Sequence, residues 1–224
     1  MFVYQNTNGH ICVTFEDNKP VKTPDYVFTV DAHTLCVNGE EIAPVKVTKI
    51  EENCVNTACT VITETVGIDL NGCTVSIPED TAGDGVYMVP QGGKLIISGD
   101  GVINGVGKND YNMAIWANGG DVIINDGTIT NKGATGNDNT HFDLVYAKNG
   151  SVVTINGGTF ICETPQWTLN NNDSNPGQFV VKGGRFFQYD PSNSMTEPTG
   201  AVNNFVADGY KVINDGDWYE VVKA

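Results

Sequence analysis

VTINGGTF, at residues 153–160, is the clearest copy of a phrase that recurs along the chain and indicates its fold. It is a β-branched run followed by a polar residue, a pair of glycines and a second β-rich step. Related copies are IISGDGVI (96–103), VIINDGTI (122–129) and FVVKGGRF (179–186), with looser copies at IDLNGCTV (68–75) and NFVADGYKV (204–212). Aligned on the second residue of the glycine pair, successive copies are 28, 26, 31, 26 and 25 residues apart. Self-similarity at such a period is typical of stacked repeats.

A second phrase recurs in phase with the first. VYM (86–88), IWA (115–117) and VYA (145–147) each precede a turn rich in Gly or Asn. Each repeat therefore contains at least three short β-rich pieces, and no window shows apolar residues at helical spacing. Three strands in about 25–30 residues predict one coil of a parallel β-helix. An all-β sandwich with turns every 8–12 residues is the alternative, but the in-phase recurrence of both phrases favours the β-helix.

We predict an all-β chain organised in three parts. Residues 1–55 do not match the repeat and form a small N-terminal β module, with hairpin turns at Asn8-Gly9 and Asn38-Gly39. Residues 56–209 form a right-handed parallel β-helix of about five to six coils. Residues 210–224 form a hairpin that caps the last coil with Trp218 and Tyr219. Two inward columns are expected to form the core: Ile97, Ile124, Ile155 and Val181; and Val102 or Ile103, Ile129, Phe160 and Phe186.

Two polar excursions interrupt the period, at residues 130–143 and 164–177. Stacked cores accept insertions at their corners, so both are expected to project as loops, where binding sites usually lie. Asp138, His141 and Trp167 are therefore the candidate ligand contacts. Residues 137–143 carry oxygen ligands and a histidine suited to Ca²⁺ or a sugar, but they lack EF-hand spacing. Trp116 falls within the strand ladder, where packing is the expected role.

Composition excludes several partners. The 12 Lys and Arg residues against 27 Asp and Glu residues give a net charge of −15, so nothing basic is available to neutralise nucleic-acid phosphates or anionic lipids. The N-terminal residues lack the basic and apolar regions of a signal peptide. No run reaches the roughly 18 apolar residues of a membrane span. We expect neither nucleic acid nor membrane as a partner.

No catalytic, cofactor-binding or metal-binding residue is predicted. Asp100, Asp126 and Asp208 each precede a glycine, which is what turn geometry alone requires. No basic residue marks a carboxylate pair of the kind that polysaccharide cleavage uses. Cys54 and Cys59 have the spacing of half a zinc site, but no second pair follows.

The last part of the chain resembles a known group of proteins. The stretch concerned follows coils of the INGGTF type and reads FFQYDPSNSMTEPTGAVNNFVADGYKVINDGDWYEVV (186–222). It resembles the ends of short β-helical virion appendage proteins of bacteriophages that infect gut bacteria: head fibres, capsid decorations and tail-fibre-like subunits. The resemblance covers roughly residues 60–222. It implies a non-enzymatic structural protein of the virion, assembled in the host cytoplasm. Residues 1–55 lie outside the resemblance. Because a non-repeating end is commonly the anchor of a fibrous protein, we expect this segment to contact other virion proteins and the subunit to be a homo-oligomer, most simply a trimer.

Two other functions stay open at this stage. One is a tail-associated receptor-binding module or adhesin, whose loops hold host surface glycan. The other is a β-helical enzyme that degrades polysaccharide. Glycan binding without cleavage would favour the adhesin, and loss of polymer viscosity would favour the enzyme.

Overall fold

The computed structural model describes residues 46–78, 85–106, 113–134 and 142–224, and the backbone of the strands before residue 46. The chain divides into two compact units, Met1–Lys46 and Val47–Ala224. The predicted boundary after residue 55 is therefore about nine residues too late. Residues 47–55 belong to the second unit, because β6 (Lys46–Lys49) and β7 (Cys54–Val55) pair within its sheets.

The first unit is a five-stranded antiparallel sheet in the order β1-β2-β3-β4-β5. Its strands are β1 (Phe2–Gln5), β2 (Ile11–Thr14), β3 (Tyr26–Thr29), β4 (Thr34–Val37) and β5 (Glu40–Ile42). Strands β1 and β2 flank the predicted Asn8-Gly9 turn, and β4 and β5 flank Asn38-Gly39. The turn residues themselves lie outside the described residues.

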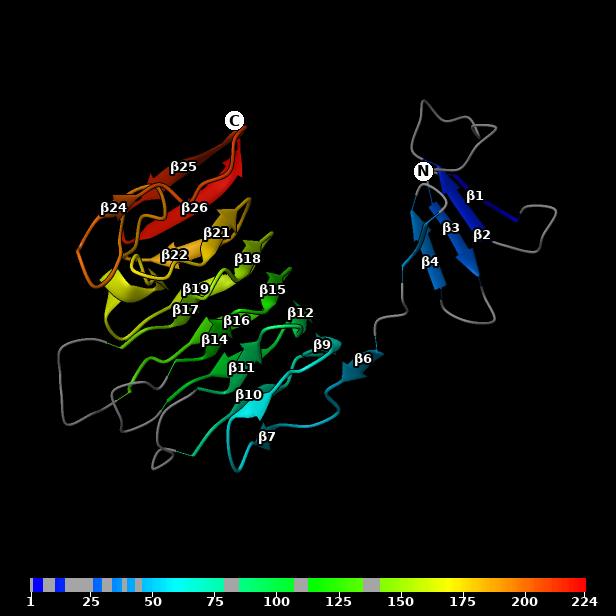
Figure 1. Ribbon diagram of the computed structural model, residues 1–224, viewed down its shortest axis with the longest axis horizontal. Coiled ribbons are helices and arrows are strands. Elements are labelled where there is room, and N and C mark those ends of the chain that lie inside the picture. The colour runs from blue at the N-terminus through cyan, green and yellow to red at the C-terminus, as the bar shows by residue number, and fades with distance from the viewer. Residues whose placement is uncertain are drawn as a thin grey trace. The chain divides into compact units, whose positions relative to one another are not determined.

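The second unit is a parallel β-helix, as the repeat predicts (Figure 1). Its strands stack into three parallel sheets, here called sheets I, II and III. Sheet I contains β6 (Lys46–Lys49), β9 (Thr65–Asp69), β12 (Lys94–Ser98), β15 (Asp121–Ile124), β18 (Val152–Ile155) and β21 (Gln178–Val181). Sheet II contains β7 (Cys54–Val55), β10 (Thr74–Ser76), β13 (Val102–Asn104), β16 (Thr128–Thr130), β19 (Thr159–Ile161) and β22 (Arg185–Phe187). Sheet III contains β8 (Thr60–Val61), β11 (Tyr87–Pro90), β14 (Ile115–Asn118), β17 (Val145–Lys148) and β20 (Leu169–Asn171).

The regular stack has about four turns, slightly fewer than the five to six coils predicted. They run from β9-β10-β11 to β18-β19-β20. The turn before them is small, since β7 and β8 have two residues each. The copy NFVADGYKV does not build a further coil. Val206 makes a single parallel bridge to Val181, and the chain then turns into the C-terminal hairpin.

The predicted core columns are confirmed by the strand register. Ile97 pairs with Ile124, which pairs with Ile155, which pairs with Val181, and all four side chains are fully buried. The second column contains Ile103 rather than Val102, followed by Ile129, Phe160 and Phe186. The rings of its last two members stack at 4.7 Å. Burial of these two columns stabilises the folded β-helix, by about 25 cal/mol for each Å² of apolar surface removed from water.

The first copy of the second phrase, at residues 86–88, is displaced by one residue, whereas the copies at 115–117 and 145–147 pair in the predicted register. Tyr87, not Val86, pairs with Ile115, so Met88 pairs with Trp116. Because side chains alternate across a strand, this register places Met88, Trp116 and Tyr146 in one column on the outer face of sheet III.

The glycine pairs form the corners between sheets I and II. Gly127, Gly158 and Gly184 all have positive φ angles, between 93° and 98°. A Cβ at Gly158 would lie 2.9 Å from the carbonyl oxygen of Gly127, so the corner needs glycine for both conformation and space. The carbonyl of each corner accepts a hydrogen bond from the first strand residue of the next turn, as in Thr159 N–H to Gly127 O at 2.8 Å.

The C-terminal end of the β-helix is closed on every sheet. Strands β25 (Tyr210–Asp215) and β26 (Trp218–Lys223) form the predicted hairpin, and β26 pairs antiparallel with β22 at the end of sheet II. Val181 in sheet I exchanges hydrogen bonds with Phe205 and Ala207. In sheet III, Glu197 donates its N–H to Asn171 at 3.1 Å. Trp218 and Tyr219 are half-buried in the hairpin.

Candidate functional site

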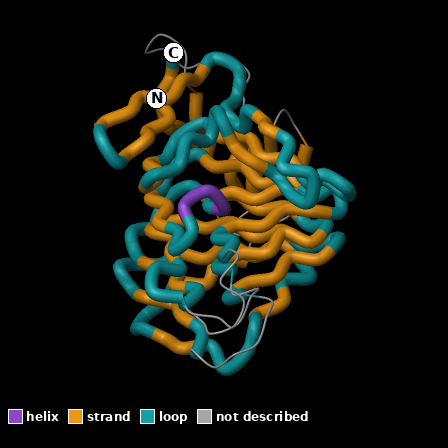
Figure 2. Tube along the Cα trace, turned by 90° about the vertical axis from the view of Figure 1, so that its left-hand side faces the viewer, coloured by secondary structure: helices purple, strands orange, loops and turns teal. Residues whose placement is uncertain are grey.

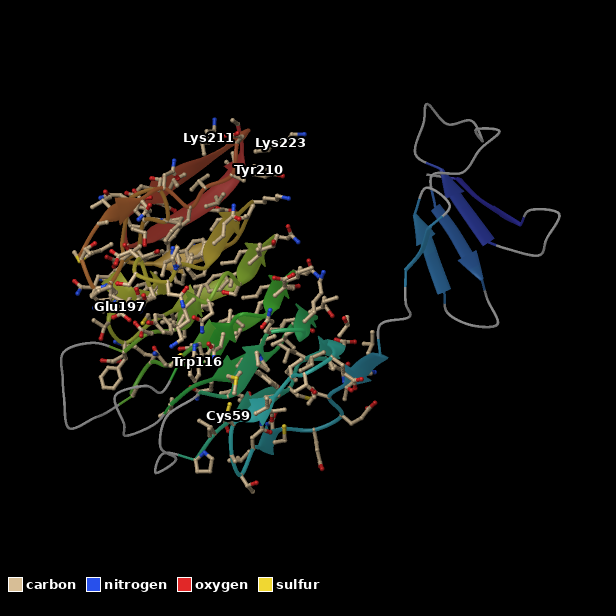
Figure 3. All side chains as sticks on the ribbon, in the orientation of Figure 1. Cys59, Trp116, Glu197, Tyr210, Lys211 and Lys223 are labelled. Atoms are coloured by element: carbon tan, nitrogen blue, oxygen red, sulfur yellow. The ribbon has the colours of Figure 1, made fainter. Side chains whose placement is uncertain are left out.

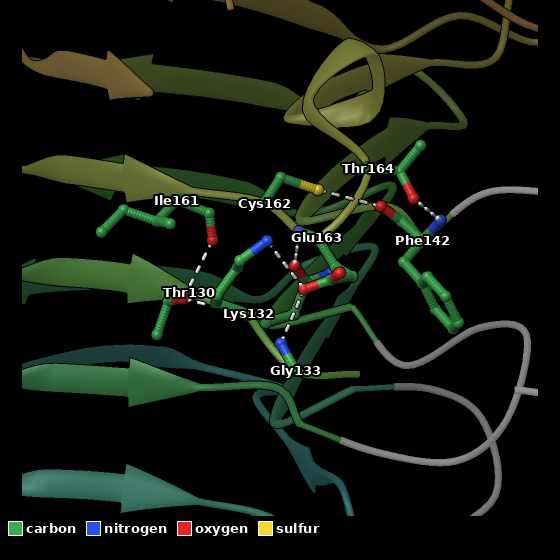
Figure 4. Close-up of polar contacts among 9 residues, drawn as sticks. Thr130, Lys132, Gly133, Phe142, Ile161, Cys162, Glu163 and Thr164 are labelled. Atoms are coloured by element: carbon green, nitrogen blue, oxygen red, sulfur yellow. Dashed lines mark hydrogen bonds and ion pairs between the residues drawn. The ribbon is translucent and has the colours of Figure 1, made fainter. Parts of the chain in front are cut away.

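The excursion at 130–143 is anchored at both ends to a corner of the β-helix (Figure 4). The buried Asn131 donates its side-chain N–H to the carbonyl of Asp143 at 3.0 Å and accepts the N–H of Glu163 at 2.8 Å. The Phe142 N–H donates to Thr164 Oγ1 at 3.2 Å. Asp138 and His141, the predicted ligand contacts, lie outside the described residues. The excursion that contains them therefore begins and ends at a corner whose residues are held by hydrogen bonds.

Glu163 contacts the residues at the start of this excursion. Its carboxylate accepts the N–H of Gly133 at 2.7 Å and lies 3.2 Å from the Lys132 ammonium (Figure 4). The hydrogen bond from Gly133, with a smaller contribution from Lys132, lowers the pKa of Glu163. Cys162 beside it donates to the Phe142 carbonyl, and burial raises the pKa of this thiol to about 12, so it is not a reactive thiolate.

Trp167 does not lie in a projecting loop. Residues 164–177 contain a one-turn 3-10 helix, η1 (Pro165–Trp167), and strand β20 of sheet III, and η1 lies on the outside of the strand stack (Figure 2). The Trp167 side chain is only 8% exposed. The predicted projecting loop is therefore wrong for this residue, and a ring this buried offers little open face for stacking on a sugar. Its exposed neighbour is Gln166.

Trp116 lies on the outer face of sheet III, and Figure 3 labels it there. Its side chain is half-buried, and the Lys148 ammonium lies 5.1 Å from the centre of the ring. The indole N–H is buried and finds no acceptor among the described residues. The predicted packing role fits this position on the outer face, where a cation covers the ring.

A buried polar cluster lies next to Trp116 on the same face. Asp143 is 3% exposed and accepts a hydrogen bond from the buried Asn170 at 2.8 Å. Tyr146 accepts one from Asn172 at 2.9 Å and also contacts Glu197, which Figure 3 labels. Burial raises the pKa of Asp143 to about 7; the charge of Glu197 adds to the rise and the Asn170 hydrogen bond opposes it.

This cluster contains two carboxylates but does not form an open acid–base pair. Glycoside cleavage requires both groups to face the substrate across a groove, whereas Asp143 is enclosed. The cluster instead fastens residues 196–199 to the end of sheet III. Thr196 Oγ1 donates to Asp173 at 3.2 Å, next to the Glu197–Asn171 hydrogen bond.

Two aspartates of the repeats serve turns, whereas Asp121 Oδ1 accepts the N–H of Val152 in the next coil at 3.1 Å. Asp126 Oδ1 accepts the N–H of Gly127 at 2.8 Å, and Asp69 Oδ1 accepts the N–H of Asn71 at 3.1 Å. Within the described residues, no group of three or more His, Cys, Asp or Glu side chains could hold a metal ion. The half zinc site suggested by Cys54 and Cys59 thus gains no further ligand there. No helix in the same residues is long and apolar enough to cross a membrane.

A pocket of about 230 Å³ opens beside η1. Its walls come from η1, from the chain after β22 and from β23 (Ser194–Met195), which pairs with β24 (Val202–Asn203). The lining residues are Gln166, Gln188, Tyr189, Asp190, Asn193 and Met195. We call it the Gln166 pocket. Sequence reasoning missed it because its walls are about twenty residues apart and lie outside the repeated phrase.

Comparisons with protein-family models, with curated proteins and with solved structures find no match to this chain.

Proposed function

We propose that the chain is a non-enzymatic structural subunit of a bacteriophage particle, a head fibre or capsid decoration that projects from the surface. The sequence resemblance over residues 60–222 motivates the phage assignment. The β-helix supports a projecting role, because coils stacked on one continuous core form a stiff body that each further coil lengthens.

The observation that carries the proposal is the difference between the two ends of the β-helix. The first turn exposes one valine in each sheet: Val47 in β6 is 61% exposed, Val55 in β7 is 61% and Val61 in β8 is 49%. Within the described part of residues 47–224, no strand pairs with the outer edges of β7 and β8. The other end is closed. Figure 3 labels Cys59 near the open end and Tyr210, Lys211 and Lys223 at the closed end.

An open strand edge with exposed β-branched side chains is a surface that proteins normally cover. The charges near it permit contact with another protein. Residues 46–64 carry two lysines against three glutamates, a net charge of −1, whereas the whole chain carries −15. Association through this end therefore meets less repulsion than the rest of the surface would cause. We assign this end to the particle side and the hairpin to the distal side.

The first unit fits the same orientation. It is non-repeating, has its own sheet and precedes the open end in the chain. In this proposal it contacts other virion proteins, and the subunit assembles as a homotrimer. The mass of the purified chain under native conditions measures the copy number.

Composition of purified particles tests the proposal. Mass spectrometry of particles banded in a density gradient should recover the chain at a fixed ratio to the major capsid protein. The ratio should persist after a high-salt wash, because the proposed contact includes buried apolar surface. Recovery of the chain only in the particle-free lysate would contradict the proposal.

A further inference from the structure

One wall of the Gln166 pocket carries hydrogen-bonding groups that are not used within the fold. The side-chain amides of Gln166 and Asn193 are exposed and make no hydrogen bond to the described residues. Asp190 Oδ1 accepts from the N–H and the hydroxyl of Ser192, at 2.9 and 2.7 Å, and its other oxygen remains available. These groups converge on one hollow from two separate segments of the chain.

The lining of the pocket also includes an apolar side chain. Met195 on β23 is 39% exposed and lines the pocket. Its strand partner Val202 on β24 is 64% exposed. Of these two side chains only Met195 lines the pocket, so a ligand there would meet polar groups and one apolar side chain at once.

The walls are held in place by contacts outside the pocket. Tyr189 is buried, and its hydroxyl bonds to the Leu169 carbonyl at 3.2 Å and to Ser194 Oγ at 2.5 Å. Gln188 has a φ angle of +51° and is fixed to Asp217 of the terminal hairpin through its N–H at 2.6 Å and its side chain at 3.2 Å. A preformed pocket loses little conformational entropy when it binds.

We propose that the Gln166 pocket binds one uncharged sugar ring. Amide side chains both donate and accept, and a carboxylate accepts, so together they can pair with hydroxyl groups in either direction. The Met195 side chain suits the C–H face of a pyranose. Among the described residues no Lys or Arg lines the pocket, and the net charge of −15 disfavours an anion. A single carboxylate is too few for a dedicated calcium site.

The volume sets the size of the ligand. About 230 Å³ lies below the roughly 300–1,000 Å³ of drug-sized ligand pockets. The pocket therefore holds one ring, and the neighbouring units of a longer saccharide extend into solvent. The inference is independent of particle attachment, because the pocket lies within residues 166–195 and shares no residue with the open end.

Saturation-transfer NMR on the full chain tests the inference. The uncharged probes are methyl glucoside, methyl galactoside and N-acetylglucosamine. Glucuronate and glucosamine are the charged sugars tested for comparison. We expect saturation of at least one uncharged probe. A Gln166→Ala/Asn193→Ala double variant should weaken its binding about tenfold or more, because two hydrogen bonds to the ligand are lost. The melting temperature should stay unchanged, since neither side chain bonds within the described fold.

Gln178→Ala is the matched control. Gln178 is an exposed glutamine on β21 that does not line the pocket, and its removal should leave binding unchanged. Three results would overturn the inference: no saturation of any uncharged probe, equal binding by the double variant, or preference for a charged probe.

Discussion

Val221 in the C-terminal hairpin donates its backbone N–H to the carbonyl oxygen of Gly184 at 3.0 Å. The same bond joins Thr128 to Gly101, Thr159 to Gly127 and Arg185 to Gly158, at 2.8 to 2.9 Å. The hairpin therefore occupies the place of the next coil, although its strands run antiparallel to the stack. Trp218 adds side-chain contacts, with its ring 5.2 Å from that of Phe187 and 4.5 Å from the Arg185 guanidinium.

Deletion of residues 210–224 should produce aggregation. The truncation bares the edge of β22 and the Gly184 carbonyl, and an uncovered strand edge pairs with other chains. Light scattering of the truncated and full chains at equal concentration measures the effect. A truncated chain that stays monodisperse, with the melting temperature of the full chain, would show that the hairpin is not a cap.

Ile155→Asp should abolish folding, because an unpaired carboxylate would lie in the fully buried column. Ile155→Ala should fold with a loss of about 2–5 kcal/mol in the free energy of unfolding, from transfer and cavity terms. Thr154→Ala, on the outer face of the same strand, is the control and should change it by less than about 1 kcal/mol. Equal effects at both positions in denaturant titrations would contradict the inward column.

Asp143 should make the protein less stable as the pH rises. Its pKa is raised from an ordinary value near 4 to about 7, so the folded state binds the proton more tightly than the unfolded state. The stabilisation is fully present below pH 4 and is lost as the pH rises through 7. Over this range it amounts to at most about 4 kcal/mol.

The variant Asp143→Asn isolates this effect, because it imitates the protonated acid and keeps an oxygen for the Asn170 hydrogen bond. The free energy of unfolding of the wild type relative to Asp143→Asn should fall between pH 4 and pH 8. Asp126→Asn, in an exposed turn, is the matched control for a single Asp-to-Asn change. If the free energy of unfolding of Asp143→Asn has the same pH dependence as that of the wild type, the Asp143 carboxyl group does not titrate in this range.

The purified chain should not depolymerise host capsular or cell-wall glycan. Asp126 serves a turn, and the enclosed Asp143 cannot reach a polymer. Viscometry of a glycan solution during incubation measures this. A loss of viscosity that disappears in Asp100→Asn or Asp126→Asn would establish an enzyme in place of the structural role.

The regular part of the fold could be predicted because its signals repeat. The glycine pairs at Gly157-Gly158 and Gly183-Gly184, with Ile or Val at fixed distances before them, fix both the period and the inward register. Strand β20 was missed because Leu169 is its one apolar residue and polar side chains surround it. Asn170 and Asn172 find partners in Asp143 and Tyr146, which no local pattern reveals.

The ends and the pocket depend on contacts between distant segments. Strands β6, β7 and β8 belong to the β-helix but lack a glycine pair, so the repeat begins too late in the sequence to show the boundary at Lys46 and Val47. The Gln166 pocket joins η1 to residues after β22 that approach only in the folded chain. The burial of Trp167 could not be predicted either, since nothing in the neighbouring sequence indicates that its ring is buried.

Electron cryo-microscopy of intact particles, with a separate label on each end of the full chain, tests both the projecting role and its direction. We expect a projecting density on the particle, with the Val47, Val55 and Val61 end toward the surface and the residue 210–224 hairpin away from it. Particles without density for the chain, or with the hairpin against the surface and the valine end distal, would contradict it.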